Sequence, residues 1–178
     1  MKELRASRRR FLTATSLFAG APFVSRLSWA ACSPMQKLQY AAIGLGGRGM
    51  FDVQSISKHE KVKMVAGADV DSATAKKLET RMEGVKTFSD WREMFETMAA
   101  DVDVVSVSTP DHMHGIMAMS AMNLGKHVYV QKPLAQTIGE CRAMEETARR
   151  NKVIVQMGTQ GASSFNRLNF NEEGPHGT

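Results

Sequence analysis

The chain has 178 residues, 43% of them hydrophobic and 23% charged, a composition typical of one folded domain with additional segments. Its formal charge of +5 arises within residues 1–30, where six basic residues accompany one acidic residue, and the remainder of the chain is neutral. The folded part therefore gives no electrostatic reason to expect a nucleic-acid partner. Two cysteines, Cys32 and Cys141, are too few for a disulfide framework, and no Cys/His spacing predicts a metal site.

The N-terminal segment resembles an export signal. Residues Ser7–Thr13 (SRRRFLT) resemble the twin-arginine motif, and an apolar stretch, Leu12–Val24, overlaps and follows them. This stretch is too short to span a bilayer. Ser28 and Ala30 then supply the small residues that precede a signal-peptide cleavage site. We predict a twin-arginine signal peptide over residues 1–30.

The predicted signal places the mature chain in the periplasm or outside the cell. Residues 31–37 would then form a linker, and the mature chain would have no transmembrane span. Two alternatives stay open. A disordered basic tail would carry the same charge, and Cys32, close to the cleavage site, would permit lipid anchoring.

Apolar runs suited to buried strands alternate with helical patterns through the rest of the chain. The predicted elements, in chain order, are a strand Leu38–Ile43, a helix Met50–Ile56, a strand Val62–Ala68, a helix from Asp71 to about Thr80, a strand Val85–Phe88, a helix from Ser89, a strand Val102–Val107, a helix Gly115–Leu124, a strand His127–Val130, a helix from Thr137 to Arg150 and a strand Val153–Met157. This alternation predicts an α/β fold over residues 38–160: a doubly wound parallel sheet in a three-layer Rossmann architecture.

A glycine-rich loop, Gly44–Gly49 (GLGGRG), separates the first predicted strand from the first predicted helix. In such a loop Gly44 permits the tight turn, Gly46 lets backbone N–H groups approach a pyrophosphate, and Gly49 lets helix and strand pack closely. The phosphates would lie at a helix N-terminus, where unpaired N–H groups favour an anion. The context predicts a dinucleotide-binding loop.

An acidic residue, Asp69, follows the second predicted strand, 20 residues after Gly49. A carboxylate there accepts hydrogen bonds from the adenosine ribose hydroxyls and repels a 2′-phosphate, which favours NAD. Asp71 serves better as the cap of the next helix. Arg48, inside the loop, can tolerate a phosphate, so NADP stays open as an alternative.

Four segments together carry a family resemblance: Gly44–Gly49, Ser108–His114 (STPDHMH), Gly125–Leu134 (GKHVYVQKPL) and Gly158–Gln160 (GTQ). In this order they make residues 38–160 resemble the N-terminal domain of the Gfo/Idh/MocA oxidoreductases, the glucose–fructose oxidoreductase and inositol dehydrogenase family. The resemblance implies an NAD(P)-binding domain that transfers hydride between nicotinamide and a hydroxyl-bearing carbon of a sugar or polyol. That sugar or polyol is the small-molecule partner we expect.

The resemblance also implies roles for individual residues. Lys132 corresponds to the lysine of the family's Glu-Lys-Pro motif, which reaches the substrate hydroxyl beside the nicotinamide, so it is the expected catalytic residue. Gln131 replaces the usual glutamate and can still hydrogen-bond a ribose hydroxyl. His114 matches the family's histidine, for which a direct role and a loop-fixing role are both open. The expected cofactor-binding residues are Gly44, Gly46, Gly47, Arg48, Gly49, Asp69, Ser108, Thr109, Pro110, His114, Gln131, Lys132 and Gln160.

The family adds a second, mostly β domain after the Rossmann unit. Residues 161–178 are too few for a domain, so we expect a truncated tail there and the absence of the second α+β domain. Two alternatives follow for function: a catalytically incomplete dinucleotide-binding module, or a redox-neutral, NAD-using epimerase or glycosidase in full-length form. An exposed sheet face would also favour self-association into a homo-oligomer.

Overall fold

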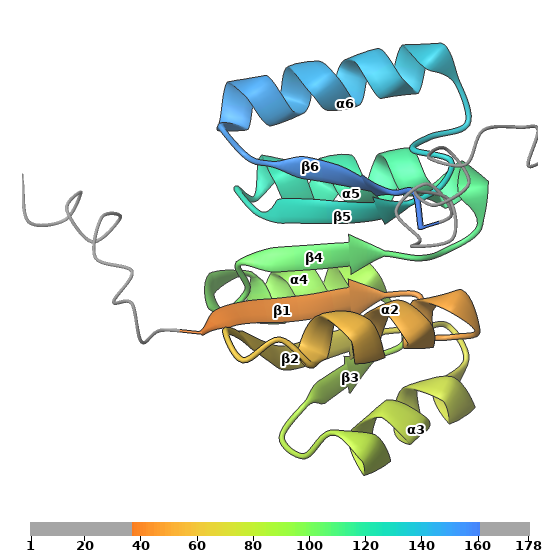
Figure 1. Ribbon diagram of the computed structural model, residues 1–178, viewed down its shortest axis with the longest axis vertical. Helices are drawn as coiled ribbons and strands as arrows, with labels where there is room; N and C mark the ends of the chain where they lie inside the picture. Colours follow the sequence, from red (N-terminus) through yellow and green to blue (C-terminus); the bar gives the residue numbers. More distant parts are fainter. Residues whose placement is uncertain (1–36, 161–178) are drawn as a thin grey trace, which may run out of the picture. The chain divides into compact units, whose positions relative to one another are not determined.

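The computed structural model describes residues 37–160; the predicted signal peptide, most of the linker and the predicted tail lie outside them. Six parallel strands form one sheet in the order β3-β2-β1-β4-β5-β6 (Figure 1). The strands are β1 Leu38–Ile43, β2 Val62–Ala68, β3 Lys86–Phe88, β4 Val104–Val107, β5 His127–Gln131 and β6 Val155–Gly158. This strand order is that of the Rossmann fold, and it confirms the predicted architecture.

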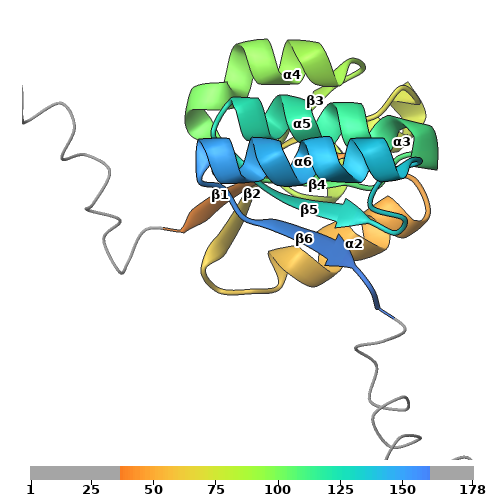
Figure 2. The ribbon, with the colours of Figure 1, turned by 90° about the horizontal axis from the view of Figure 1, so that it is seen from above.

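Helices cover both faces of the sheet. They are α2 Arg48–Ser57, α3 Ser72–Arg81, α4 Trp91–Met98, α5 His114–Asn123 and α6 Ile138–Asn151, with short 3-10 helices η2 Ala99–Asp101 and η3 Asp111–Met113. Figure 2 shows α4, α5 and α6 on one side of the sheet and α2 on the other. Between residues 37 and 160, no helix has both the length and the apolar character needed to cross a membrane.

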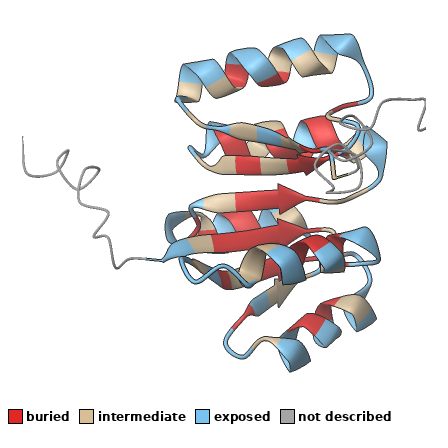
Figure 3. Cartoon of the chain, in the orientation of Figure 1, coloured by how far each residue is buried: buried red, intermediate tan, exposed pale blue. Residues whose placement is uncertain are grey.

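The central strand β1 shows why the sheet is buried on both faces. Successive side chains of a strand point to opposite faces. Tyr40 and Ala42 pack into a core shared with α2 and α3, whereas Ala41 and Ile43 pack into the larger core under α4, α5 and α6. Figure 3 shows that most of the central strands is buried. All four residues are buried, so β1 is a continuous apolar run, as parallel strands require.

The cap predicted at Asp71 forms, and similar local contacts fix the ends of other helices. Asp71 Oδ1 accepts a hydrogen bond from the backbone N–H of Ala73 at 3.0 Å. Thr137 and Glu140 make both hydrogen bonds of a capping box. Gly125, after α5, has a φ of 75°, the left-handed conformation that glycine adopts readily after the end of a helix.

Several element boundaries differ from the prediction by one or two residues, and a local polar contact accompanies three of these differences. The helix expected from Ser89 begins at Trp91, because the carboxylate of Asp90 caps it. Strand β4 begins at Val104; the preceding Asp103 instead directs its carboxylate to the backbone N–H of Gln39 at 2.8 Å. Strand β6 begins two residues later than expected, because the N–H of Val153 still bonds to a carbonyl of α6.

Candidate cofactor site

A cleft of about 400 Å³ opens at the carboxyl ends of the central strands. It lies where the strand order reverses between β1 and β4, the place at which open α/β sheets bind ligands. Its lining comes from the ends of β1, β2 and β4 and from the segments that follow them: Ile43, Gly44, Gly46, Ala68, Asp69, Val70, Ser89, Trp91, Ser108, Thr109, Pro110, Met113 and Met117. The cleft therefore gathers six of the predicted cofactor residues: Gly44, Gly46, Asp69, Ser108, Thr109 and Pro110.

The glycines of the loop differ in what surrounds them. Gly44 has a φ of 83°, and a side chain there would collide with the carbonyl of Ser108. A side chain at Gly49 would collide with the Gly44 carbonyl, because α2 packs directly against the end of β1. At Gly46, by contrast, an added Cβ would meet nothing within 4 Å. The space in front of Gly46 is thus free for a ligand to approach the backbone.

The start of helix α2 suits an anion. Gly47 is the N-cap residue, and no side chain caps the helix there. The first N–H groups of a helix have no partner within the helix, and the helix dipole adds positive potential. An open backbone beside an uncapped helix start fits the pyrophosphate of a dinucleotide, which is the group that Gly44–Gly49 predicts.

Asp69 lies at the rim of this loop and is held in place by two hydrogen bonds. Its Oδ2 accepts from the backbone N–H of Leu45 at 2.7 Å, and its Oδ1 accepts from the N–H of Asp71 at 2.9 Å. It lines the cleft beside Val70, whose side chain is exposed. A fixed carboxylate here can accept further hydrogen bonds from ribose hydroxyls, and it places negative charge where a 2′-phosphate would have to lie.

Arg48 is directed away from the end of β2. Its Nε lies 3.4 Å from Asp52 Oδ1, and its guanidinium stacks over the Phe51 ring at 4.5 Å. Its Nη2 also lies 3.0 Å from the side-chain oxygen of Gln160 when that amide is oriented toward its donors. These contacts place Arg48 toward the ends of β4, β5 and β6, so in this structure it does not offer a partner for a phosphate beside Asp69.

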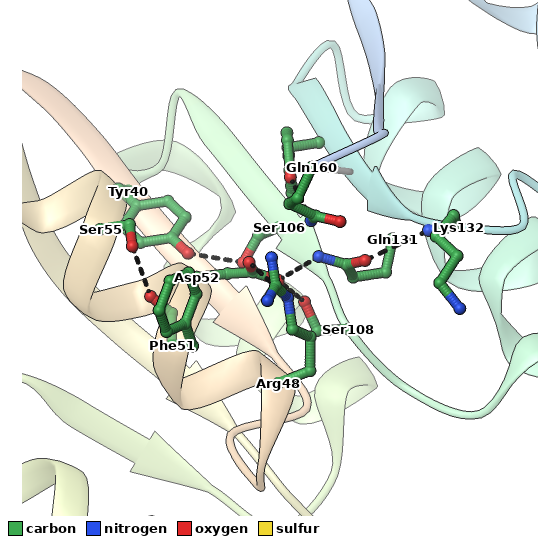
Figure 4. A network of polar contacts seen from close by, with 11 residues as sticks. Tyr40, Arg48, Phe51, Asp52, Ser55, Ser106, Ser108, Gln131, Lys132 and Gln160 are labelled. Carbon is green, nitrogen blue, oxygen red and sulfur yellow. Dashed lines mark hydrogen bonds and ion pairs between the residues drawn. The ribbon is translucent and has the colours of Figure 1, made fainter. Parts of the chain in front are cut away.

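Asp52, on the inner side of α2, is the centre of a polar network at the sheet's edge (Figure 4). Its side chain is only 4% exposed. Its Oδ2 accepts hydrogen bonds from Ser108 Oγ at 3.0 Å and from Gln131 Nε2 at 2.5 Å. The carboxylate thus connects α2 with the ends of β4 and β5. Burial raises the pKa of the nearby Tyr129 hydroxyl, and the negative charge of Asp52 raises it further.

The turn after β4 carries three predicted residues. Ser108 is anchored to β1 through its N–H, which donates to the carbonyl of Ile43 at 2.9 Å. Thr109 and Pro110 line the cleft. His114, at the start of α5, is 1% exposed, and its ring nitrogens lie 2.8 Å from the Thr109 carbonyl and 2.6 Å from the Pro133 carbonyl. Both contacts are those of a residue that holds loops together, and the buried ring lies among protein atoms.

Lys132 follows β5, at the same edge of the sheet as the glycine loop. Its backbone N–H donates to Gln131 Oε1 at 3.3 Å. Its side chain is exposed, and within residues 37–160 no acidic group forms an ion pair with it. Figure 4 shows its amine directed away from Asp52. The amine is therefore accessible to a small molecule.

Sequence reasoning missed two parts of this site. The apolar wall that Trp91, Met113 and Met117 form was not predicted. Asp52 was not singled out at all. A signal for it exists, because Asp52 occupies the inward stripe of α2 with Gly49 and Val53, where a charged residue is unusual unless it has partners.

Comparisons with known proteins agree with this geometry. Residues 38–159 match the Gfo/Idh/MocA model, described as an oxidoreductase family with an NAD-binding Rossmann fold. One relative is a 1-carboxy-3-chloro-3,4-dihydroxycyclo hexa-1,5-diene dehydrogenase from Comamonas testosteroni, which is 29% identical over 64% of this chain and 28% of the relative. Another is a glycosyl hydrolase family 109 protein from Shewanella sp. (strain ANA-3), which is 30% identical over 80% of this chain and 33% of the relative. The chain thus spans about a third of the length of these relatives.

Solved structures show the same fold. The myo-inositol 2-dehydrogenase of Lactobacillus plantarum superposes with a TM-score of 0.71 at 24% identity, over 78% of this chain and 41% of that one. GenD2 from gentamicin A biosynthesis, solved in complex with NAD, superposes with a TM-score of 0.70 at 24% identity, over 77% and 38% of the two chains. With the family match covering most of its length, this chain belongs to the Gfo/Idh/MocA oxidoreductase family and carries its NAD-binding Rossmann domain.

Proposed function

We propose that this chain is the NAD-binding part of an enzyme that transfers a hydride between NAD and a hydroxyl-bearing carbon of a sugar or polyol. The observation that carries the proposal is the placement of an accessible lysine, Lys132, at the same sheet edge as the glycine loop and Asp69. The names of several relatives support the substrate class, among them a levoglucosan dehydrogenase that is 42% identical over 69 residues.

Different residues would bind different parts of the cofactor. The backbone around Gly46 and the start of α2 would hold the pyrophosphate, and Asp69 would hold the adenosine ribose. The apolar wall that includes Trp91 and Met117 would cover the adenine half of the cofactor. The nicotinamide, when bound, supplies the hydride chemistry.

Lys132 would accept and donate the proton of the substrate hydroxyl. Oxidation of an alcohol carbon removes a hydride from the carbon and a proton from its oxygen, and reduction returns both. An uncharged lysine amine can take the hydroxyl proton, and the ammonium form can give it back. The exposed side chain of Lys132, free of ion pairs within residues 37–160, is suited to that exchange.

A second candidate is a reaction in which NAD is used but not consumed. The glycosyl hydrolase family 109 relatives match 80% of this chain, a larger share than the Comamonas dehydrogenase. In this alternative, transient oxidation of the sugar would be followed by return of the hydride, so that glycoside cleavage or epimerisation gives no net NADH. Lys132 would hold the same proton in both reactions.

We also propose that the chain is exported by the twin-arginine route. The support is the sequence alone: the paired arginines of Ser7–Thr13, the apolar stretch Leu12–Val24 and the small residues Ser28 and Ala30. Lipid anchoring at Cys32 is the alternative arrangement of the same segment.

A cofactor titration followed by product analysis tests the function. Purified protein is titrated with NAD and NADP by calorimetry, and then incubated with NAD and a panel of sugars, polyols and aryl glycosides. Saturable NAD binding supports the cofactor assignment, and failure to bind would overturn it. Net NADH formation favours the dehydrogenase, whereas release of the aryl group without net NADH favours the redox-neutral reaction.

A further inference from the structure

The buried carboxylate of Asp52 has three side-chain partners, and each belongs to a different part of the site. Oδ1 faces Arg48 Nε at 3.4 Å, on the first turn of α2. Oδ2 accepts from Ser108 Oγ at 3.0 Å, after β4, and from Gln131 Nε2 at 2.5 Å, at the end of β5. A carboxylate that is 4% exposed needs such partners, because an unpaired buried charge is strongly destabilising.

The amide of Gln131 is fixed in one orientation by two contacts of opposite kind. Its Nε2 donates to Asp52, and its Oε1 accepts the backbone N–H of Lys132 at 3.3 Å. The side chain is 5% exposed, so water does not compete freely for either atom. Reversing the amide would place oxygen against oxygen at Asp52 and N–H against N–H at Lys132.

This arrangement requires an amide at position 131. A glutamate there would offer no hydrogen to Asp52, and two carboxylates this close cannot both stay ionised at neutral pH without a large cost. The glutamine in the Gln-Lys-Pro sequence, where the family resemblance predicts a glutamate, is therefore matched to the carboxylate on α2. Asp52 on α2 carries the negative charge, and the Gln131 amide on β5 links this carboxylate to the backbone of Lys132.

We propose that Asp52 is a positioning residue for Lys132: by holding the Gln131 amide in one orientation, it fixes the backbone of the turn that carries the lysine. The proposal rests on the role of Lys132 in the proposed function. It also ties the helix that begins at the phosphate loop to the turn that carries the proton-transfer group. The Asp52–Gln131 pair acts as one unit, so the two residues can be exchanged together but not singly.

A reciprocal exchange tests the pair. The variants are Gln131→Glu, Asp52→Asn and the double variant Asp52→Asn/Gln131→Glu, which restores one amide facing one carboxylate. Gln136→Glu is the matched control, because Gln136 is exposed on the same segment and is not among the side-chain partners of Asp52. Thermal unfolding is measured from about pH 5 to pH 8, and the Lys132 backbone amide is followed by NMR.

The expected signature is a pH-dependent loss that the double variant removes. In Gln131→Glu one carboxyl of the facing pair has a raised pKa in the folded state, so stability is lost as the pH rises through that value. We expect Tm to fall by roughly 5–10 °C at pH 8, by less at pH 5, and to recover in the double variant. The Lys132 amide resonance should shift in Gln131→Glu and return in the double variant.

The outcomes separate this proposal from the proposed function. The pairing is overturned if Gln131→Glu has the same Tm as Gln136→Glu across the pH range. It is also overturned if the Tm of the double variant is no higher than that of the less stable single variant. If Gln131→Glu does not fold, a double variant that does fold supports the pairing. If Asp52→Asn folds but neither Gln131→Glu nor the double variant does, the pairing is overturned. An unchanged Lys132 amide overturns the positioning role. NAD titration of the parent protein tests the proposed function independently of all these results.

Discussion

The carboxylate of Asp69 accepts a hydrogen bond from the backbone N–H of Leu45 at 2.7 Å, which joins the end of β2 to the glycine loop. One residue thus shapes the loop and presents an acidic group at the cleft. Because the second oxygen bonds to the N–H of Asp71, the carboxylate cannot rotate away to make room for a phosphate without breaking both bonds.

The first prediction concerns cofactor choice at Asp69. The parent protein should bind NAD more tightly than NADP, and Asp69→Asn should reduce the ratio of the two affinities. Hydrogen bonds to a charged group are worth about 1.5–3 kcal/mol, so NAD affinity should fall roughly 10- to 100-fold. Calorimetric titration with both cofactors measures the effect. Asp71→Asn is the control, since that carboxylate caps α3, and a parent that prefers NADP would contradict the prediction.

The second prediction compares two glycines of the same loop. Gly46→Ala should fold with an almost unchanged Tm, because its methyl group meets no atom within 4 Å, yet it should weaken NAD binding at least tenfold by filling the approach to the backbone. Gly49→Ala should lower stability by about 1–3 kcal/mol, because α2 must move away from the end of β1. Thermal unfolding and NAD titration of both variants separate the two effects. Equal effects of the two substitutions on Tm would count against the assigned roles.

The third prediction concerns Lys132. Lys132→Ala should lower turnover about 10²–10⁴-fold, the usual contribution of a general acid–base group, while NAD affinity changes little. The measurement is kcat and the NAD dissociation constant on whichever sugar or polyol the panel identifies. Lys126→Ala is a suitable control, because Lys126 directly precedes the opposite end of β5. Unchanged turnover in Lys132→Ala would exclude the lysine from proton transfer.

The fold was largely predictable because its strands are buried on both faces. Strands β1 and β2 lie over the predicted residues, Leu38–Ile43 and Val62–Ala68, since a parallel strand covered by helices on both sides is a continuous apolar run. The glycine loop was predictable for a related reason. Close packing of α2 on β1 admits no side chain at Gly49, and the Ser108 carbonyl admits none at Gly44, so the requirement is visible in the residues themselves.

The polar network was not predictable in the same way. Asp52 contacts Ser108 and Gln131 across separations of 56 and 79 residues, and no local pattern specifies such pairs. The direction of Arg48 was not predictable for a different reason. Its partner Asp52 lies only four residues later on α2, but the position of Arg48 in the loop also suits a phosphate, so the sequence does not decide between the two.

The fourth prediction concerns export. Substitution of Arg8 and Arg9 by lysine should leave the precursor in the cytoplasm, because the paired arginines are the feature of Ser7–Thr13 that a twin-arginine translocase would recognise. Cell fractionation and immunoblotting of precursor and processed chain measure this. Arg26→Lys is the control, since Arg26 lies beyond the motif and its apolar stretch. Continued export of the double variant would indicate another route.

The last prediction concerns His114, whose ring lies between the Thr109 and Pro133 carbonyl oxygens, 2.8 and 2.6 Å from its two nitrogens. A ring N–H can donate to one of these carbonyls, and the tautomer decides which nitrogen carries it. The ring thereby joins the turn after β4 to the turn that carries Lys132.

His114→Ala would remove the ring N–H donor that faces these two part-buried carbonyls. Each unpaired group costs about 1–3 kcal/mol, so Tm should fall by roughly 5–10 °C or more. His112→Ala, two residues away and exposed, should leave Tm nearly unchanged. If His114 acts only by holding the turns, the NMR shifts of the Thr109 and Lys132 amides should move together in His114→Ala. A variant with parental Tm and amide shifts but lost turnover would instead show that the ring takes part directly in the chemistry.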